Sequence, residues 1–364
     1  MSAGGNRARP QGPRRDRRGR SRSVREDRRT GEDRARKELT AELERAFLHQ
    51  AEQCEQSGSQ LYAELCRRLA REPAVREIVD DGRWDRPLQL LGGLHYLALS
   101  EELDPWVDPV PVLEARRDWL RRFVRERGVQ TNEVQRSWAL LPCFLDIARR
   151  AGVEVIDLVE LGSSAGLNLL WDRYHYRYGS GTWGAESAPL SLSGEERRPV
   201  PAALLHLRPR VRHRRGVDIS PIDLTHPQDA LLLKSFVWAD QTARLERLDR
   251  AVETLRSDPP TLERGDVVER LPDLLAERQL GALTVVFATA VIGYLGKEGH
   301  VRIVSALEEA GRQFPLAYLW TARPRPGEHG YWGIWARLLP DGEELLLAHA
   351  GFHGQWLEWL DAPE

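Results

Sequence analysis

The sequence predicts an α/β protein, with an all-helical N-terminal region followed by a mostly parallel sheet that has helices on both faces. Apolar residues recur at helical spacing from Leu39 to about Arg150. From Val153 onward, short apolar runs alternate with helical segments, which is typical of β-α units. The stretch WGIWARLL, PDG, EELLLAHAG then predicts a hairpin on a tight turn. Several β-α units closed by a hairpin imply one antiparallel strand at an edge.

The charge of the chain is unevenly distributed. Residues 1–38 hold 14 Arg or Lys against 6 Asp or Glu, which leaves 39 against 49 for the remainder. This Arg-rich tail has almost no large apolar side chains, so we expect it to be disordered. It can contact RNA, DNA or an acidic partner through phosphates, and nucleic acid is expected only there. The alternative is a solubilising extension without a partner.

Composition restricts the class of protein. The three cysteines, Cys54, Cys66 and Cys143, form no paired or metal-like spacing, so no disulfide framework and no metal site are expected. The longest apolar run, 282–295, is shorter than the roughly 20 residues of a membrane helix. We therefore expect a soluble cytoplasmic protein that does not bind membranes. The sequence leaves the oligomeric state open.

The helical region is expected to span residues 39–150, with breaks at Pro73, Pro87 and Pro105. Its last helix is predicted to begin at Asn132, where Asn132 and Gln135 would form a capping pair. Pro142 is expected to bend this helix.

The α/β region is expected to span residues 151–364. Its first strand is 153–161, which a loop connects to a helix carrying Leu167, Leu170 and Tyr174. A polar, Pro-rich insertion is expected at about 179–210. Four further strands are predicted: one ends within residues 216–224, one leads into residues 263–272, and two cover residues 283–290 and 316–322. Helices are predicted over residues 235–255 and 299–313.

The stretch Gly162-Ser163-Ser164-Ala165-Gly166 fits two motifs. As G-x-S-x-G it predicts the nucleophile elbow of a serine hydrolase, with Ser164 paired to a downstream carboxylate and to His349 or His353. As a glycine loop preceded by Glu160, it predicts a cofactor site at the end of a strand. About 110 helical residues precede this loop, whereas several strands precede the elbow in the hydrolase fold. The cofactor interpretation is therefore favoured, and the hydrolase remains an alternative.

Two further acids follow the next strands. Asp218, in GVDISP, can accept hydrogen bonds from both hydroxyls of a ribose. Asp266, after Gly265, could meet an adenine amino group. The alternative for each is an ordinary acid that binds the N-terminus of a helix.

This order of elements resembles the class I S-adenosylmethionine-dependent methyltransferases. Residues 160–166 look like their first motif, residues 217–221 like the motif that holds the ribose, and Gly265-Asp266 like the adenine-side motif. The resemblance implies a Rossmann-like doubly wound sheet of seven strands whose last hairpin is antiparallel. It also implies S-adenosylmethionine as cofactor, bound by Glu160, Gly162, Ser163, Ser164, Gly166, Asp218, Ile219 and Asp266.

More closely, the chain resembles an uncharacterised bacterial family, domain of unknown function 2332, over roughly residues 45–360. The stretches that carry this resemblance are VQTNEV, ELGSSAGLNLLWDRYHYRYG, GVDISPIDL, FVWADQ and GQWLEWL. The chain departs from most methyltransferases at Ser164, where many have glycine. It also departs at Thr289 and Ala290, where an Asn-Pro-Pro-Tyr-like acceptor signature would stand.

The expected function is binding of S-adenosylmethionine and methylation of a small-molecule acceptor. Candidate catalytic residues are Glu133, Tyr294 and His353, the last because an ordinary histidine has a pKa near neutrality. The insertion at 179–210 is a candidate lid over the acceptor. Because no acceptor signature is present, a non-catalytic Rossmann-like module that recruits RNA or protein through the tail stays open as an alternative.

Overall fold

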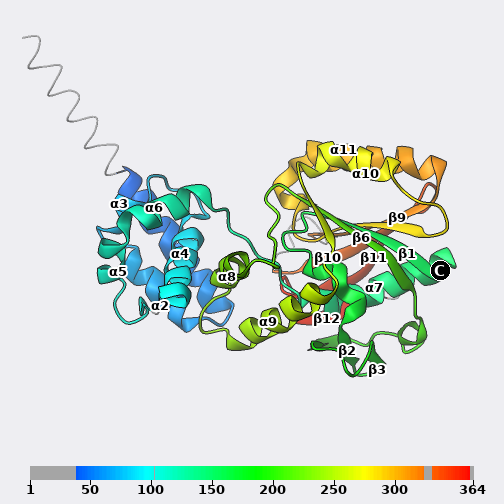
Figure 1. Ribbon diagram of the computed structural model, residues 1–364, viewed down its shortest axis with the longest axis horizontal. Helices are drawn as coiled ribbons and strands as arrows, with labels where there is room; N and C mark the ends of the chain where they lie inside the picture. The colour runs from blue at the N-terminus through cyan, green and yellow to red at the C-terminus, as the bar shows by residue number, and fades with distance from the viewer. Residues whose placement is uncertain (1–37, 102, 324–329, 361–364) are drawn as a thin grey trace, which may run out of the picture.

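The computed structural model describes residues 38–101, 103–323 and 330–360, so the expectations for residues 1–37 lie outside the described residues. A helical region, coloured blue to cyan, lies beside a larger α/β region (Figure 1). The predicted combination of an N-terminal helical region with a mixed α/β region is confirmed. Within the described residues, no helix is long and apolar enough to cross a membrane.

The helical region consists of residues 38–56 and five further helices: α2 (Gln60–Leu69), α3 (Val75–Ile78), α4 (Arg86–Glu101), α5 (Val110–Ala115) and α6 (Arg117–Glu126). Their apolar faces meet in one core cluster that includes Phe47, Tyr62 and Leu90. Pro87 lies in the first turn of α4, where the missing N–H costs no helical hydrogen bond.

One helix from the second half of the chain joins this region. Helix α8 (Pro227–Ser235) packs on α4, and Phe236, just after α8, lies against Phe123 of α6. Trp238 stacks on Tyr62 at a centroid distance of 6.0 Å, and Asp240 accepts a hydrogen bond of 2.7 Å from Ser59 Oγ. The stretch FVWADQ therefore attaches the helical region to the rest of the molecule.

The main sheet has nine strands within the described residues, in the order β5-β12-β11-β10-β9-β8-β1-β6-β7. Its parallel part is β7 (Thr261–Arg264), β6 (Arg210–Asp218), β1 (Val155–Leu161), β8 (Leu283–Ala288) and β9 (Leu316–Ala322). An antiparallel series continues the sheet with β10 (Trp332–Leu339), β11 (Leu345–Ala350) and β12 (Trp356–Trp359), and β5 (Glu195–Arg198) pairs parallel with β12 at the edge.

The mostly parallel sheet and its antiparallel hairpin are thus confirmed, but the expected number of seven strands is wrong. The two additional strands are β12 and β5. Strand β5 has the sequence EERR, so it carries no apolar alternation from which a strand could be predicted.

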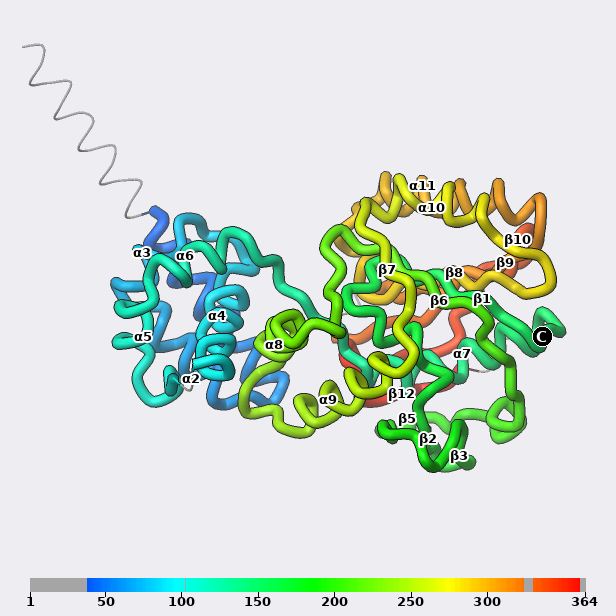
Figure 2. Tube along the Cα trace, in the orientation of Figure 1, coloured from blue at the N-terminus to red at the C-terminus, as the bar shows by residue number. Residues whose placement is uncertain are grey.

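Helices cover both faces of the parallel strands, as Figures 1 and 2 show. Alternate residues of β1 point to opposite faces because successive side chains of a strand alternate. Ile156 and Leu158 share a core cluster with α7 (Arg136–Ala151) and α9 (Thr242–Ser257). Val159 and Leu161 share another with α10 (Val267–Ala276) and α11 (Ile292–Gln313).

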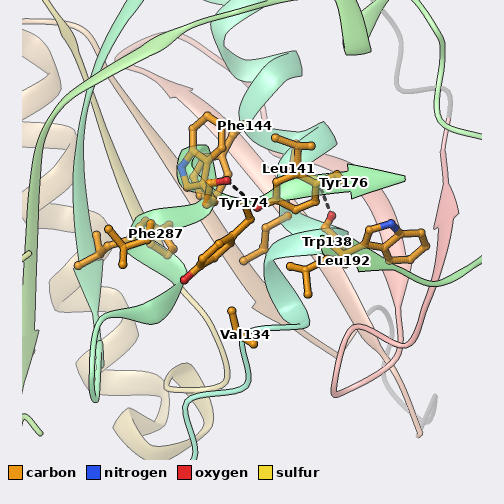
Figure 3. Packing of buried hydrophobic residues seen from close by; sticks show 14 of the residues in the cluster. Val134, Trp138, Leu141, Phe144, Tyr174, Tyr176, Leu192 and Phe287 are labelled. Atoms are coloured by element: carbon orange, nitrogen blue, oxygen red, sulfur yellow. Dashed lines mark hydrogen bonds between the residues drawn. The ribbon is translucent and has the colours of Figure 1, made fainter. Parts of the chain in front are cut away.

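Helix α7 packs against the sheet. Trp138 and Phe144 of α7 lie in one buried cluster with Tyr176 and Phe287, and Figure 3 labels these side chains. The predicted capping pair at its start is wrong. Helix α7 begins at Arg136, Asn132 Oδ1 accepts a hydrogen bond from Leu167 N (2.8 Å), and the Gln135 side chain donates to Ser193 O and Gly354 O.

The segment after β1 is not the expected helix. It is a short 3-10 helix, η1 (Leu167–Arg173), with Leu170 outside helical geometry and Tyr174 in an extended conformation after it. Every side chain from Leu167 to Trp171 is buried, so the segment has no polar face on which a longer helix could meet solvent.

The insertion at 179–210, the candidate lid, is folded onto the body of the protein. It contributes β3 (Gly181–Trp183) and β4 (Ser191–Ser193), which pair with β2 (His175–Tyr178) in a small second sheet. Trp183 and Leu192 are buried in the core cluster that contains α7. Its apolar side chains therefore hold it against the body of the protein.

Candidate functional site

The candidate site lies at the carboxyl ends of three neighbouring strands, β6, β1 and β8. Leu161 at the end of β1 is in register with Val217 of β6 and with Ala288 of β8. Strands β6 and β7 follow on one side of β1 and β8 and β9 on the other, so the strand order reverses at β1. In open parallel sheets, ligands bind in the crevice outside such a reversal.

The loop after β1 has an unusual backbone that brings it close to its neighbours. Gly162 and Gly166 have φ angles of 73° and 76°, which favour glycine. A Cβ atom on Gly162 would lie 2.7 Å from the side chain of Val291, and one on Gly166 would lie 2.9 Å from Pro260. Both glycines are therefore required by packing as well as by conformation.

Backbone strain occurs on both sides of the strand reversal. Ser164 (φ 50°) and Ala290 (φ 59°) are the non-glycine residues with positive φ in the described ranges, and they follow β1 and β8. Hydrogen bonds hold both: Ser164 N donates to Asp218 Oδ2 (2.9 Å), and Ala290 N donates to Thr321 Oγ1 (2.9 Å). Strain of this kind is concentrated at functional sites.

Glu160 is a fully buried acid without hydrogen bonds. It is the penultimate residue of β1 and has 0% exposure, and neither carboxylate oxygen has a hydrogen-bond partner among the described residues. Burial raises the pKa of Glu160 well above the ordinary value, and the nearby Asp218 raises it further. The charge of Arg136 and the neighbouring Asn168 amide act in the opposite direction and do not outweigh burial. Asn168 Oδ1 accepts from Ser137, which leaves Asn168 Nδ2 unpartnered as well.

Ser163 adds another buried group to this position. Its backbone N–H and that of Gly162 both donate to Val217 O. Its hydroxyl is fully buried and has no partner in the described part of the chain. Several polar atoms without partners thus lie around the end of β1, where buried groups are normally satisfied by protein, water or ligand.

Asp218 organises the end of β6. Its two carboxylate oxygens accept one backbone hydrogen bond each, from Ser164 N (2.9 Å) and from Ser220 N (2.8 Å). Each oxygen retains one lone pair. The next residue, Ile219, has a side chain that is 72% exposed.

Asp266 has a structural role that the sequence left open. It is the N-cap of α10, and its Oδ1 accepts from Val268 N (2.8 Å) and Glu269 N (3.3 Å). Both bonds to the helix use Oδ1, so the capping role is compatible with a ligand contact at Oδ2.

Glu133 is surrounded by cationic side chains. It pairs with Arg244 at 2.6 Å, and its side chain is 5% exposed. Burial opposes the charge of Glu133, but Arg244, His353, Arg247 and Arg136 outweigh it and keep the pKa of Glu133 below the ordinary value. The carboxylate is therefore ionised and a weak base.

His353 and Tyr294 lie in the same neighbourhood. Burial and the charges of Arg244 and Arg136 lower the pKa of His353 to about 4. The charge of Glu133 acts in the opposite direction but is outweighed. The expectation of a histidine titrating near neutrality is thus wrong, because the sequence does not show the two arginines that face it. Tyr294, which is 75% exposed, contributes to the electrostatic environment of Arg136.

A cleft of about 1140 Å³ lies between the helical region and this cluster. Its lining includes the aromatic residues Trp84, Trp238 and Phe236 together with Arg244 and His353. Glu160 and Asp218 do not line it. The cleft thus reaches the charged cluster, while the strand ends lie beyond that cluster.

Sequence reasoning missed several of these residues. Gln130 accepts a hydrogen bond from Ser164 Oγ (2.7 Å), and Asn168 lies beside Glu160. Arg244 and Arg247 are spaced by three residues on α9, so they share one helix face, but this pattern is also that of an ordinary solvated surface. Within the described residues, no group of three or more His, Cys, Asp or Glu side chains is arranged to hold a metal ion.

The comparisons with known proteins identify a family. Neither a curated protein nor a solved structure matches the chain significantly. A family model described as "Uncharacterized protein conserved in bacteria (DUF2332)" matches residues 44–359, which include both the helical and the α/β region. The chain therefore belongs to this bacterial family.

Proposed function

We propose that the protein binds S-adenosylmethionine at the carboxyl ends of β1 and β6 and methylates a small-molecule acceptor. The parallel strands β7-β6-β1-β8-β9 follow the order 3-2-1-4-5 when numbered along the chain, which is the order of doubly wound nucleotide-binding sheets. The glycine loop and the strained backbone lie at the strand reversal, where such sheets hold their ligands.

The observation that carries the proposal is Glu160. Neither carboxylate oxygen of this buried acid accepts a hydrogen bond, although the Asn168 amide lies beside it, and a ligand that brings further donors would lower the cost of its burial. The ammonium group of a methionine moiety is such a donor. The residues around the end of β1 therefore fit the amino-acid part of S-adenosylmethionine.

The other predicted residues fit the remaining parts of this cofactor. Asp218 has a spare lone pair on each oxygen for the two ribose hydroxyls. The exposed Ile219 offers an apolar surface for the adenine. Gly162 and Gly166 keep side chains away from the loop. Asp266 is the weakest member of the set because its role as an N-cap already explains its presence.

When bound, this cofactor supplies a methyl group activated by a positively charged sulfur. The protein's contribution to such a transfer is chiefly the positioning of the acceptor. Tyr294 and His353 are near Arg136, which in turn is near Glu160, so they remain the candidates that contact the acceptor. His353 is unprotonated at neutral pH and can accept a proton, although its low pKa makes it a weak base.

The serine-hydrolase alternative is less well supported. Ser164 Oγ donates to Gln130 Oε1 rather than to a histidine. His353 Nδ1 has no partner among residues of the described ranges, and His349 Nδ1 lies 3.3 Å from Glu358. A serine nucleophile needs a base within hydrogen-bond reach. The alternative in which the tail recruits RNA or protein concerns residues outside the description, and removal of residues 1–36 would test it.

Calorimetry with S-adenosylmethionine and S-adenosylhomocysteine tests the proposal. We expect both to bind the unaltered protein. Asp218→Ala is expected to weaken binding about tenfold or more, because hydrogen bonds to a charged group contribute about 1.5–3 kcal/mol. Asp223→Ala is the matched control, since it removes a neighbouring exposed acid that contacts Thr225. Binding of a nicotinamide dinucleotide without binding of either compound would overturn the proposal in favour of an oxidoreductase.

A further inference from the structure

The cationic cluster around Glu133 carries more positive than negative charge. Arg136, Arg244 and Arg247 all act on Glu133, which pairs with Arg244. The other acid near them is Glu160, whose burial raises its pKa well above the ordinary value, while the low pKa of His353 leaves that side chain neutral at pH 7. Three arginines thus face two carboxylates, Glu133 and Glu160, and burial opposes ionisation of the second, so the cluster of described residues carries an excess of positive charge. Partly buried charge of this kind is costly unless a counter-charge is supplied.

Arg247 is the member of the cluster that lacks a partner. Arg244 bonds Glu133 and Gln241, and Arg136 Nε donates to Phe352 O (3.0 Å). Arg247 makes no hydrogen bond or ion pair with the described residues, and its Nε is buried, as is the unpartnered Nε of Arg244. Two guanidinium groups on one face of α9 thus have donors free for a ligand.

The cleft reaches this cluster at Arg244 and His353, Arg247 lies about one turn further along α9, and the cleft supplies an apolar surface. Trp84, Phe236, Trp238 and Phe352 line it together with Arg244, and Trp84 is 63% exposed. The other charged groups of the lining balance one another: two are acidic, Glu42 and Asp81, and two are basic, Arg45 and Arg83. The excess of positive charge is therefore confined to the arginine cluster.

We infer that the acceptor is a small organic anion, whose carboxylate or phosphate group binds Arg244 and Arg247 while its apolar body lies against the aromatic side chains of the cleft. Planar guanidinium groups match both kinds of oxyanion. The role of the anion as methyl acceptor rests on the proposed function. The binding of the anion to the arginines does not depend on that function.

The weak bases of the site agree with this class of ligand. Glu133 is ionised and paired, and His353 has a low pKa. A neutral hydroxyl or ammonium acceptor would need a base to remove its proton. An ionised oxygen forms the bond to the methyl carbon with its own electron pair while the carbon–sulfur pair returns to sulfur, so no proton has to move.

Ligand-observed NMR titration with four probes tests the inference: benzoate, phenyl phosphate, inorganic phosphate and benzyl alcohol. The two aromatic anions are expected to bind more tightly than inorganic phosphate, because inorganic phosphate lacks the apolar ring. They are also expected to bind more tightly than benzyl alcohol, because benzyl alcohol lacks the negative charge. Whichever of benzoate and phenyl phosphate binds more tightly identifies the oxyanion. Equal binding of benzyl alcohol and benzoate, or no binding of either anion, overturns the inference.

Arg247→Gln and Arg250→Gln form a matched pair of variants on α9. Each removes one positive charge, but Arg250 is exposed and outside the cluster. Binding of the preferred aromatic anion is expected to fall about tenfold or more in Arg247→Gln and to stay unchanged in Arg250→Gln. Equal melting temperatures establish that both variants are folded. An unchanged affinity in Arg247→Gln contradicts the inference.

Titration of the same variants with S-adenosylhomocysteine separates this inference from the proposed function. If the cluster binds the acceptor, Arg247→Gln binds S-adenosylhomocysteine as the unaltered protein does. If only S-adenosylhomocysteine binding is lost, the cluster holds the carboxylate of the cofactor and the inference is wrong. If S-adenosylhomocysteine does not bind at all while the aromatic anion depends on Arg247, the anion site stands and the proposed function fails.

Discussion

At the scale of single residues, Glu160 couples the stability of the protein to pH. Burial raises its pKa in the folded state above the ordinary value of 4.5. Between these two values the unfolded chain has lost the proton and the folded protein still holds it, so stability falls as pH rises. Below pH 4.5 both states hold the proton and the penalty is absent.

We therefore predict that Glu160→Gln is more stable than the unaltered protein at pH 7 and that this advantage shrinks as pH falls toward 4.5. The change is about 1.4 kcal/mol per pH unit within the window. Denaturant unfolding from pH 4 to 8 measures it. His353 contributes the opposite slope between about pH 4 and its ordinary value, but both proteins share it and it cancels in the difference.

The control for this prediction is Glu154→Gln. Glu154 is an exposed acid just before β1, so its replacement is expected to leave the pH dependence unchanged. A difference between Glu160→Gln and the unaltered protein that does not vary with pH would show that Glu160 is ionised in the folded protein.

At the scale of elements, the loop after β1 depends on Gly162. Alanine there has to adopt a φ of 73°, and its Cβ meets Val291 at 2.7 Å. We predict that Gly162→Ala lowers the free energy of unfolding by more than the roughly 1–2 kcal/mol expected from the backbone conformation alone. Denaturant unfolding measures the loss.

Gly58 is the matched control for Gly162. It has a similar φ of 81°, but no atom lies within 4 Å of the position its Cβ would take. Gly58→Ala therefore measures the backbone contribution alone. The double variant Gly162→Ala, Val291→Ala is expected to recover only part of the steric loss, because Val291 Cβ itself lies 2.8 Å from the added atom. Equal losses for Gly58→Ala and Gly162→Ala would show that Val291 moves aside at no cost.

The elements also show where sequence reasoning succeeds. The strands β1, β8 and β9 are predicted because they are nearly continuous apolar runs, which are typical of strands covered on both faces of a sheet. Strand β5 and the 3-10 helix η1 are missed because EERR lacks apolar residues and η1 is buried on every side. The strand-end residues Glu160 and Asp218 follow from the position of the strands. Arg244 and Arg247 do not, because only the fold brings α9 to Glu133.

At the scale of the whole molecule, the helical region depends on a segment from the second half of the chain. Phe236 and Trp238 pack on Phe123 and Tyr62, about 110 or more residues away in sequence by position number. We predict that a fragment of residues 38–131 melts with low cooperativity, because removing this segment exposes apolar surface that it normally covers.

Circular dichroism with thermal melting tests this prediction. Joining residues 226–241 to the fragment through a flexible linker is expected to restore a cooperative transition and raise the melting temperature. A linker carrying the same residues in scrambled order is the control. If residues 38–131 alone melt as cooperatively as the joined fragment, the helical region folds independently of α8.

The path of the chain between its two regions also limits how the cleft walls can move. The chain crosses from one region to the other through residues 127–135, 219–226 and 236–241, on the way into α7, into α8 and into α9. A body attached by one flexible connection has nearly all its rotational degrees of freedom, whereas three connections leave only those rotations that all three can follow together. The last crossing also leads directly into the helix that carries Arg244 and Arg247, so a displacement of the aromatic wall pulls on the backbone that holds the arginines.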